Sequence, residues 1–429
     1  MGAVITAVGG LLALLALEAP VDDEAAPAPS VTDLDERLAR TEQLILNRQP
    51  ALHLGGYIDI GFFVPGGDGS GYVQDFGHAL RRNESRYGWV FLGDILAPAV
   101  NSRGEVADLG SAPGVDRFDS VHSRGAPGFI ANEVNLTMRA SISPSAVATA
   151  SVNFAPRSGS NFSLGDTTDV DLAQVEWMPT DSQRTSLFVG KMESVLGVEY
   201  RDRKANRRLG ITPSLLARYT TGTALGVKVR SKLGADDWLI LAAALTNGSN
   251  TVEQWHFYDE LDSNAAKTGS ARVSVSPRLP FALEVGLSGS CGAQDRSRFN
   301  DGLMWFLGPD LLAHAGALDV KGQWLTGRAP GNELEDVYGL HLAGAGYLEA
   351  DWTISATVAL MGRAEYRDAR VWLGTERLYL SRVWRATAAL RLVFNEHATV
   401  KAEYLHNGEY GGLPGVRDDV FTSSLVLAY

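Results

Sequence analysis

The 429-residue sequence contains a single cysteine, Cys291, which excludes an intramolecular disulfide and any metal site built on paired cysteines. Basic residues are not in excess either. The net charge is −12, so the protein as a whole does not attract nucleic acid. Beyond the N-terminus no window reaches about 18 uninterrupted apolar residues, and transmembrane helices are therefore not expected.

Motifs of catalysis are also scarce. The eight histidines occur singly and without the HExxH spacing of a zinc site, and no Gly-x-Ser-x-Gly elbow marks a hydrolase. The glycine-rich stretch 66–71 lacks Walker spacing. We therefore expect no enzymatic activity, no cofactor, no metal and no nucleic-acid partner.

An apolar run opens the sequence, from Met1 to Leu17. It is too short to span a bilayer and is followed by small and acidic residues, which predicts a secretory signal peptide over 1–28, with an approximate end. No Lys or Arg precedes the run. Residues 29–50 are predicted to form a periplasmic linker and a short helix at 32–46. This helix has two interpretations, a mobile periplasmic helix or a small trimerisation segment.

From His53 onward, apolar residues recur at every second position, the periodicity of a β-strand with one apolar face. In the clearest strand, 384–394, Arg385 and Arg391 alternate with Trp384, Leu390 and Phe394. Similar patterns cover 54–62, 130–139, 146–154, 225–230, 281–288, 352–360, 399–404 and 420–429, with weaker ones at 87–95 and 170–177. Strands of about ten residues are long enough to cross a bilayer at a tilt.

The connections between these strands alternate in predicted length. Tight turns are expected at 143–144, 277–280, 350–351 and 395–396, and long loops at 65–86, 193–218, 248–267, 291–312 and 407–419. Short turns at one end and long loops at the other are typical of outer-membrane barrels. The sequence therefore predicts an all-β fold: a transmembrane antiparallel up-and-down β-barrel over 51–429, with about 16 strands (14–18 possible).

The last strand ends on an aromatic residue at the chain terminus. It resembles the C-terminal signal by which bacterial outer-membrane barrels are recognised for insertion, and the residues of that signal would be Phe421, Leu425, Leu427 and Tyr429. We expect this strand to close the barrel by pairing with strand 54–62. Its inward residues would then be Thr422, Ser424, Val426 and Ala428, which carry no charge.

Three segments carry a family resemblance. Leu54–Phe62 looks like the first strand of bacterial porins, and Leu187–Tyr200 is similar to the strand and Gly-x-Glu segment of phosphate-selective and related β-barrel porins. The third segment is the terminal aromatic strand. The resemblance implies passive diffusion of small polar solutes, often through a trimer. This sequence departs from the phosphate-selective type because it has no dense Arg/Lys ladder.

Charged residues predict where the pore would be lined. A loop folded into the lumen sets the constriction of a porin, and the cation cluster in loop 193–218 would favour anions there. The same cluster could instead form a solvated loop face or contact lipopolysaccharide. Charges in mid-strand are expected to face the lumen because a charge facing lipid is costly. The candidates are Arg201, Arg203, Lys204, Arg207, Arg208, Arg139, Glu133, Lys228, Arg230, Glu284, Arg385, Arg391, Lys401 and Glu403.

The predicted function is therefore a water-filled porin in the outer membrane of a Gram-negative-type bacterium. Its expected partners are outer-membrane lipid and lipopolysaccharide, small polar solutes or anions, and copies of itself in a homotrimer. Two alternatives remain at this stage: a non-channel barrel with a structural, adhesive or plugged design, and a secreted soluble all-β protein.

Overall fold

The structure is a computed structural model. It describes residues 52–65, 128–154, 168–180, 183–193, 195–234, 236–247, 265–293, 303–331, 339–373, 376–409 and 419–429. The predicted signal peptide (1–28), linker and helix (29–50), and the weak strand at 87–95 lie outside these residues.

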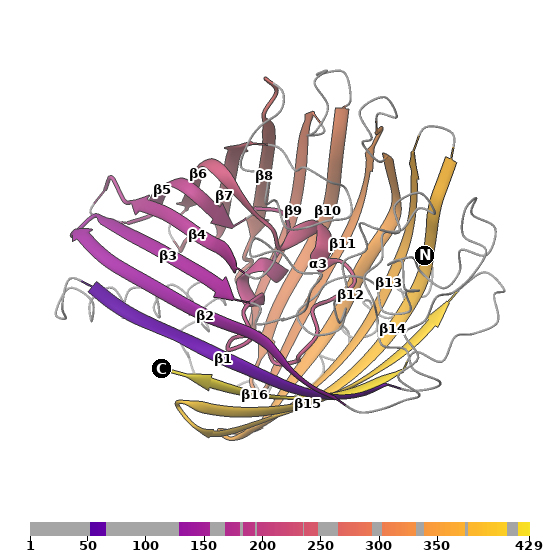
Figure 1. The fold of residues 1–429 in the computed structure, drawn as a ribbon. Coiled ribbons are helices and arrows are strands. Elements are labelled where there is room, and N and C mark those ends of the chain that lie inside the picture. The colour runs from indigo at the N-terminus through magenta and orange to yellow at the C-terminus, as the bar shows by residue number, and fades with distance from the viewer. Residues whose placement is uncertain are drawn as a thin grey trace.

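Sixteen antiparallel strands form one closed barrel in which each strand pairs with its neighbours in sequence (Figure 1). The strands are β1 Leu52–Pro65, β2 Gly128–Ser143, β3 Ala146–Phe154, β4 Thr168–Trp177, β5 Thr185–Glu193, β6 Thr223–Leu233, β7 Leu239–Thr246, β8 Thr268–Val275, β9 Ala282–Ala293, β10 Leu303–Ala315, β11 Leu318–Ala329, β12 Gly339–Ser355, β13 Val358–Leu373, β14 Glu376–Asn395, β15 Ala398–Glu409 and β16 Val420–Ala428. The predicted fold class and the preferred strand number are confirmed.

The barrel closes where the first and last strands meet. β1 pairs with β16 in a continuous antiparallel register from Tyr57 opposite Ala428 to Pro65 opposite Val420. Beyond the strand, the backbone N–H of Tyr429 donates to the carbonyl of Gly56 at 3.1 Å. The expected pairing of the C-terminal strand with strand 54–62 is therefore confirmed.

The two faces of the wall differ in polarity. In β16 the outward Phe421, Leu425 and Leu427 are exposed, whereas the inward Thr422 and Ser424 are buried. Large apolar side chains are exposed in the same way all around the barrel, among them Ile58, Val189, Leu245, Leu287, Leu307 and Trp352. An apolar exterior around a polar interior is the reverse of a soluble barrel and suits a lipid environment.

The barrel interior is occupied by the connection between β5 and β6. We call residues 195–222 the luminal segment; it contains a short 3-10 helix, η3 (Glu199–Asp202), and a single helical turn, α3 (Ala217–Thr220). In Figure 1, α3 and its neighbours lie inside the ring of strands. Among the described residues no helix is long and apolar enough to cross a membrane.

One predicted turn is wrong. Ala350 and Asp351 lie within β12, and the turn to β13 comes at 356–357. An Ala-Asp pair suggests a turn because aspartate often hydrogen-bonds its own backbone there. In the barrel, Ala350 instead pairs with Val320 and Gly362, and the Asp351 carboxylate lies 3.2 Å from the Lys321 ammonium.

Two predicted loops are too long. β9 continues to Ala293 and β10 begins at Leu303, so the 291–312 loop is confined to 294–302, and β15 continues to Glu409. The start of β10 was missed because its inward residues, Met304 and Phe306, are as apolar as its outward ones. The weak strand at 170–177 is present as β4.

Candidate functional site: the luminal segment

The luminal segment lies across the barrel and contacts most of its wall. At its start, the backbone N–H of Gly197 donates to the Ser288 hydroxyl of β9 at 2.9 Å. The N–H of Val198 donates to Gln323 Oε1 of β11 at 3.1 Å. Gly197 has a φ of +76°, which favours glycine, and a Cβ there would lie 1.8 Å from the Gln323 amide. The sequence Leu196-Gly197 therefore permits a close approach to the wall.

In the first half of the segment (195–204), charged side chains reach out to buried partners. The Arg201 guanidinium makes two 3.2 Å hydrogen bonds to the carboxylate of Glu284, which is fully buried on β9. The Arg203 guanidinium binds both carboxylate oxygens of Asp171 on β4 and also lies 3.2 Å from Glu193. Forked two-point pairing of this kind fixes the orientation of both partners.

Neighbouring groups of the first half differ in how burial and nearby charges combine to shift the pKa. Burial alone would lower the pKa of Arg203, but the carboxylates of Asp171 and Glu193 outweigh it and raise the pKa above its ordinary value. For Lys204, burial prevails and lowers the pKa despite the nearby Asp171. Burial also raises the pKa of Glu199, against the hydrogen bonds that its carboxylate accepts from Ser214.

A charged network on the wall continues from Arg201. Glu284 also accepts the Arg272 guanidinium of β8 at 2.8 Å, and Arg272 in turn pairs with Asp310 of β10 at 2.5 Å. Lys321 of β11 holds Asp202 of the segment at 2.7 Å. Cations and acids therefore alternate along this part of the interior, and each buried charge has an opposite partner.

The first half ends against β1–β3. The Lys204 ammonium donates to the Ser151 hydroxyl at 2.9 Å, and the N–H of Ala205 donates to the Tyr57 hydroxyl at 3.4 Å. Tyr57 itself donates to Glu133 at 2.7 Å. Glu133, predicted as a pore-lining residue, thus supports the segment through Tyr57.

In the second half (205–217) the pattern reverses, and charged side chains of the wall hold the segment's backbone. The Lys401 ammonium of β15 donates to three carbonyls, those of Ala205 at 2.6 Å, Gly210 at 3.0 Å and Arg208. The Glu403 carboxylate, two residues further on, accepts the N–H groups of Ile211 and Thr212 at 2.6 and 3.0 Å.

Glu365 of β13 forms a second clamp on the backbone. Its carboxylate accepts the N–H of Leu215 at 2.6 Å and is bound by Arg385 and Arg363, at 2.6 and 2.8 Å. Both arginines also donate to the Pro213 carbonyl, Arg385 at 2.6 Å and Arg363 at 3.3 Å. All three charged side chains are buried, so the interaction is unscreened by water.

The end of the segment packs in an apolar part of the interior. Leu196, Leu215, Leu216 and Tyr219 contact inward residues of β10–β13, and the whole group is buried. The wall residues of this cluster are Met304, Phe306, Leu325, Ala329, Leu340, Leu342, Ala345, Tyr347 and Ala369. These side chains fill this part of the interior and are nearly inaccessible to water.

The remaining candidate cations differ in exposure. Arg207 is exposed. Arg208 and Arg391 both interact electrostatically with Lys401, and within the described residues the Nε atoms of these two arginines have no hydrogen-bond partner. Lys228 and Arg230 of β6 both lie over the Phe188 ring, and Arg139 is half-buried on β2.

Sequence reasoning missed several groups that hold the segment. They are Asp171, Arg272, Asp310, Lys321, Gln323, Arg363 and Glu365. Arg363 and Glu365 alternate with Gly362 and Ala364, and Arg272 alternates with Ala271 and Val273. This alternation of charged and uncharged residues in mid-strand is the pattern that predicts a lumen-facing charge. Nothing in the uncharged stretch Leu209–Leu216 predicts that charged wall residues bind its backbone.

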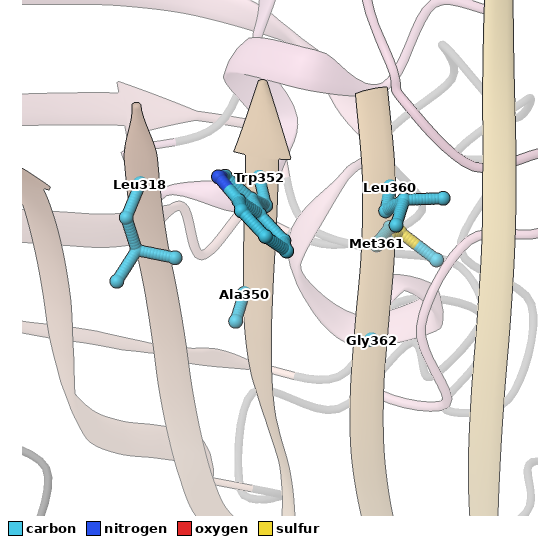
Figure 2. Close-up of a pocket in the computed structure, with 6 residues that line it drawn as sticks. All are labelled: Leu318, Ala350, Trp352, Leu360, Met361 and Gly362. Atoms are coloured by element: carbon cyan, nitrogen blue, oxygen red, sulfur yellow. The ribbon is translucent and has the colours of Figure 1, made fainter. Parts of the chain in front are cut away.

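The residues of the predicted insertion signal are outward and exposed: Phe421, Leu425, Leu427 and Tyr429. The outer wall also carries a shallow apolar hollow of about 470 Å³, shown in Figure 2. It is lined by Leu318, Ala350, Trp352, Leu360, Met361 and Gly362. Among the described residues, no group of three or more His, Cys, Asp or Glu side chains could hold a metal ion.

No family model and no curated protein sequence matches the chain. Solved structures do match it. The outer membrane channel DcaP of Acinetobacter baumannii aligns with a TM-score of 0.54 and 9% identity, covering 88% of this chain and 97% of that one. OmpF of Salmonella typhi, solved in complex with daunomycin, aligns with a TM-score of 0.52 and 10% identity, covering 88% and 97%. The chain has the fold of outer-membrane porins. At this identity the likeness concerns the fold alone.

Proposed function

We propose that the protein is an outer-membrane porin, a channel for passive diffusion of small polar or ionic solutes, whose constriction is formed by the luminal segment. The observation that carries the proposal is a segment folded across a charged interior, inside a barrel whose outer face is apolar. Such an outer face is costly in water and favourable in lipid, which argues against a secreted soluble protein. Diffusion through a pore needs no catalytic group, and we infer no enzymatic role.

We further propose that the constriction prefers anions. Arg207 is exposed, and Arg208 and Arg391 lie beside the Lys401 ammonium. Asp59 and Glu403 are the acids facing Lys401, and Glu403 is occupied by backbone N–H groups. Arg201 and Arg203 are neutralised by buried acids, so they would position the segment rather than attract solutes. Arg139, Lys228 and Arg230 would line the approach from the short-turn end. A homotrimer stays an expectation from the resemblance.

A plugged barrel is the second candidate, and a specific observation favours it. Leu215, Leu216 and Tyr219 are buried against β10–β13, so part of the interior is closed to water. A porin requires an open path beside the segment; a plugged barrel requires the segment to move before anything passes.

Planar-bilayer recording separates the two candidates. We expect reproducible channels with anion preference from the wild-type protein, and a reversal potential shifted toward cations in Arg207→Glu and further in Arg207→Glu with Arg208→Glu. Arg278→Glu, exposed at a short turn and paired with Asp236, is the charge-matched control and should leave selectivity unchanged. Absence of channels would contradict the porin proposal and favour the plug. Channels with unchanged reversal potentials would contradict the role of the two arginines.

A further inference from the structure

Three basic side chains form a row on the outer face of β11, β12 and β13. Arg328 is paired in register with His341, and His341 with Arg370. All three side chains are exposed. Residues directly opposite on neighbouring strands have their Cα atoms about 5 Å apart, so the row spans about 10 Å of the outer wall. Asp368 is the one acid on the described outward face of these strands. It lies two residues from Arg370, on the side of the row that is nearer the middle of the barrel.

A β-bulge brings His341 into this row. Inward residues of β12 alternate from Asp351 through Glu349 and Tyr347 to Ala345, and this alternation would turn residue 341 inward as well. The registers with β11 and β13 both shift near Ala343 and Gly344. The shift turns Leu342 into the lumen and His341 outward, between the two arginines. The row places two guanidinium groups on either side of an imidazole, with a single acid, Asp368, two residues from Arg370, and an anion would offset this local excess of positive charge.

The row lies at one edge of the apolar band. In the same register, Arg328 is flanked by the outward Trp305 of β10. Below the row, the Trp324 ring crosses Gly344 and Gly346 and stacks on Tyr366 at 6.0 Å. Trp305 is at the level of the row, and outward tryptophans of this kind mark the headgroup level of a membrane.

The opposite edge is marked by Trp352, the outward residue beside the hollow of Figure 2. It follows His341 by eleven positions, roughly 34 Å along the strand and about 26 Å along the axis of a barrel tilted at about 40°. This matches the height of a membrane barrel's apolar band, about 25 Å. The basic row therefore lies at headgroup level on the side of the long loops.

We propose that Arg328, His341 and Arg370 bind the phosphorylated headgroup of a lipid, the phosphorylated glucosamine of lipopolysaccharide in the outer leaflet. The guanidinium groups offer paired N–H donors that match phosphate oxygens, and the imidazole offers a third donor between them. The acyl chains of such a lipid would lie on the apolar wall beneath, beside the Trp324–Tyr366 pair. This inference rests on the proposed membrane location.

The test uses full-length protein reconstituted in phosphatidylcholine vesicles that contain diphosphoryl lipid A, then extracted into detergent. Native mass spectrometry measures the lipid A that stays bound. We expect the wild type to retain it and Arg328→Gln with Arg370→Gln to retain it at least about tenfold more weakly. Arg184→Gln with Arg278→Gln, at the short-turn end, is the matched control and should behave as wild type. Equal retention by the row variant and the wild type would overturn the proposal.

Two further arms identify the ligand. Dephosphorylated lipid A should be lost from the wild type, and retention of it would show that the phosphates are not recognised. Inorganic phosphate should fail to displace bound diphosphoryl lipid A, because it lacks the acyl chains; complete displacement would mean a free-phosphate site and contradict a lipid site. Conductance of the row variant should equal that of the wild type. Lipid retention without channels would contradict only the porin proposal. Channels without lipid retention would contradict only the lipid-binding proposal.

Discussion

The two halves of the luminal segment are held in opposite ways. The first half (195–204) contributes charged side chains of its own, such as Arg201 and Arg203, which find buried acids on the wall. The second half (205–217) is held mainly by its backbone, which is bound by Lys401, Glu403 and Glu365 of the wall. The first half is therefore held by ion pairs with a charge on each partner, and the second half by hydrogen bonds between charged wall groups and uncharged backbone.

This difference has an energetic consequence. The acids that hold the first half share their cations with other acids, because Arg203 also contacts Glu193 and Arg272 also contacts Asp310. Glu365 neutralises two wall arginines and also accepts a backbone N–H, so its removal leaves more groups unsatisfied. The second half should therefore be the more sensitive to single substitutions.

The largest effect is expected from Glu365→Gln. Arg385 would lose its carboxylate partner while buried, and Arg363 would keep only Glu349, so the free energy of unfolding should fall by about 3–5 kcal/mol. The change in the free energy of unfolding is measured by urea unfolding in detergent, with heat-modifiable migration on a gel as the readout of the folded fraction. The control Glu396→Gln alters an exposed turn carboxylate and should change stability by less than about 0.5 kcal/mol. If Glu365→Gln were as stable as Glu396→Gln, the greater sensitivity of the second half of the segment would be contradicted.

A smaller effect is expected from Lys401→Met, which keeps the length of the side chain but removes the donor to three segment carbonyls. The loss should be about 2–3 kcal/mol, because buried carbonyls would lose a charged donor. Unfolding of this variant can be followed in the same way. In bilayers we expect noisier current, since the second half would be less firmly held. If Lys401→Met gave current as quiet as that of the wild type, the role of Lys401 in holding the second half would be contradicted.

Asp171→Asn should have the smallest effect of the three, about 1–2 kcal/mol, because Arg203 would retain its contact with Glu193. The double variant with Arg203→Gln should regain part of this stability, since the buried guanidinium that lost Asp171 is also removed. A loss larger than that of Glu365→Gln would reverse the order of the two halves.

Much of the barrel could be predicted from alternation along the sequence. Strands such as 384–394 were evident because Arg385 and Arg391 separate apolar neighbours, and the wall charges Lys401 and Glu403 were identified for the same reason. β10 was harder, because its inward Met304 and Phe306 are apolar and hide the alternation. Arg363 and Glu365 obeyed the rule and were overlooked.

The luminal segment was predictable only in part. Its arginines suggested a site, but Asp171 lies 32 residues before its partner Arg203 and Glu284 lies 83 residues after its partner Arg201, and sequence spacing says nothing of such contacts. Leu209–Leu216 has no charge pattern to reveal that charged wall residues bind its backbone. The bulge that turns His341 outward is equally invisible, because a single extra residue changes the facing of a strand without changing its composition.

By itself, the sequence determined that this chain forms a long-stranded barrel with an apolar outer face, closed by its final strand. The reason is local: a period of two and strand length decide which side chains share a face. Only the tertiary structure decided which charges remain free in the interior. Closing the barrel brings distant strands to the same segment, and there the buried acids neutralise Arg201 and Arg203 and leave Arg207 exposed.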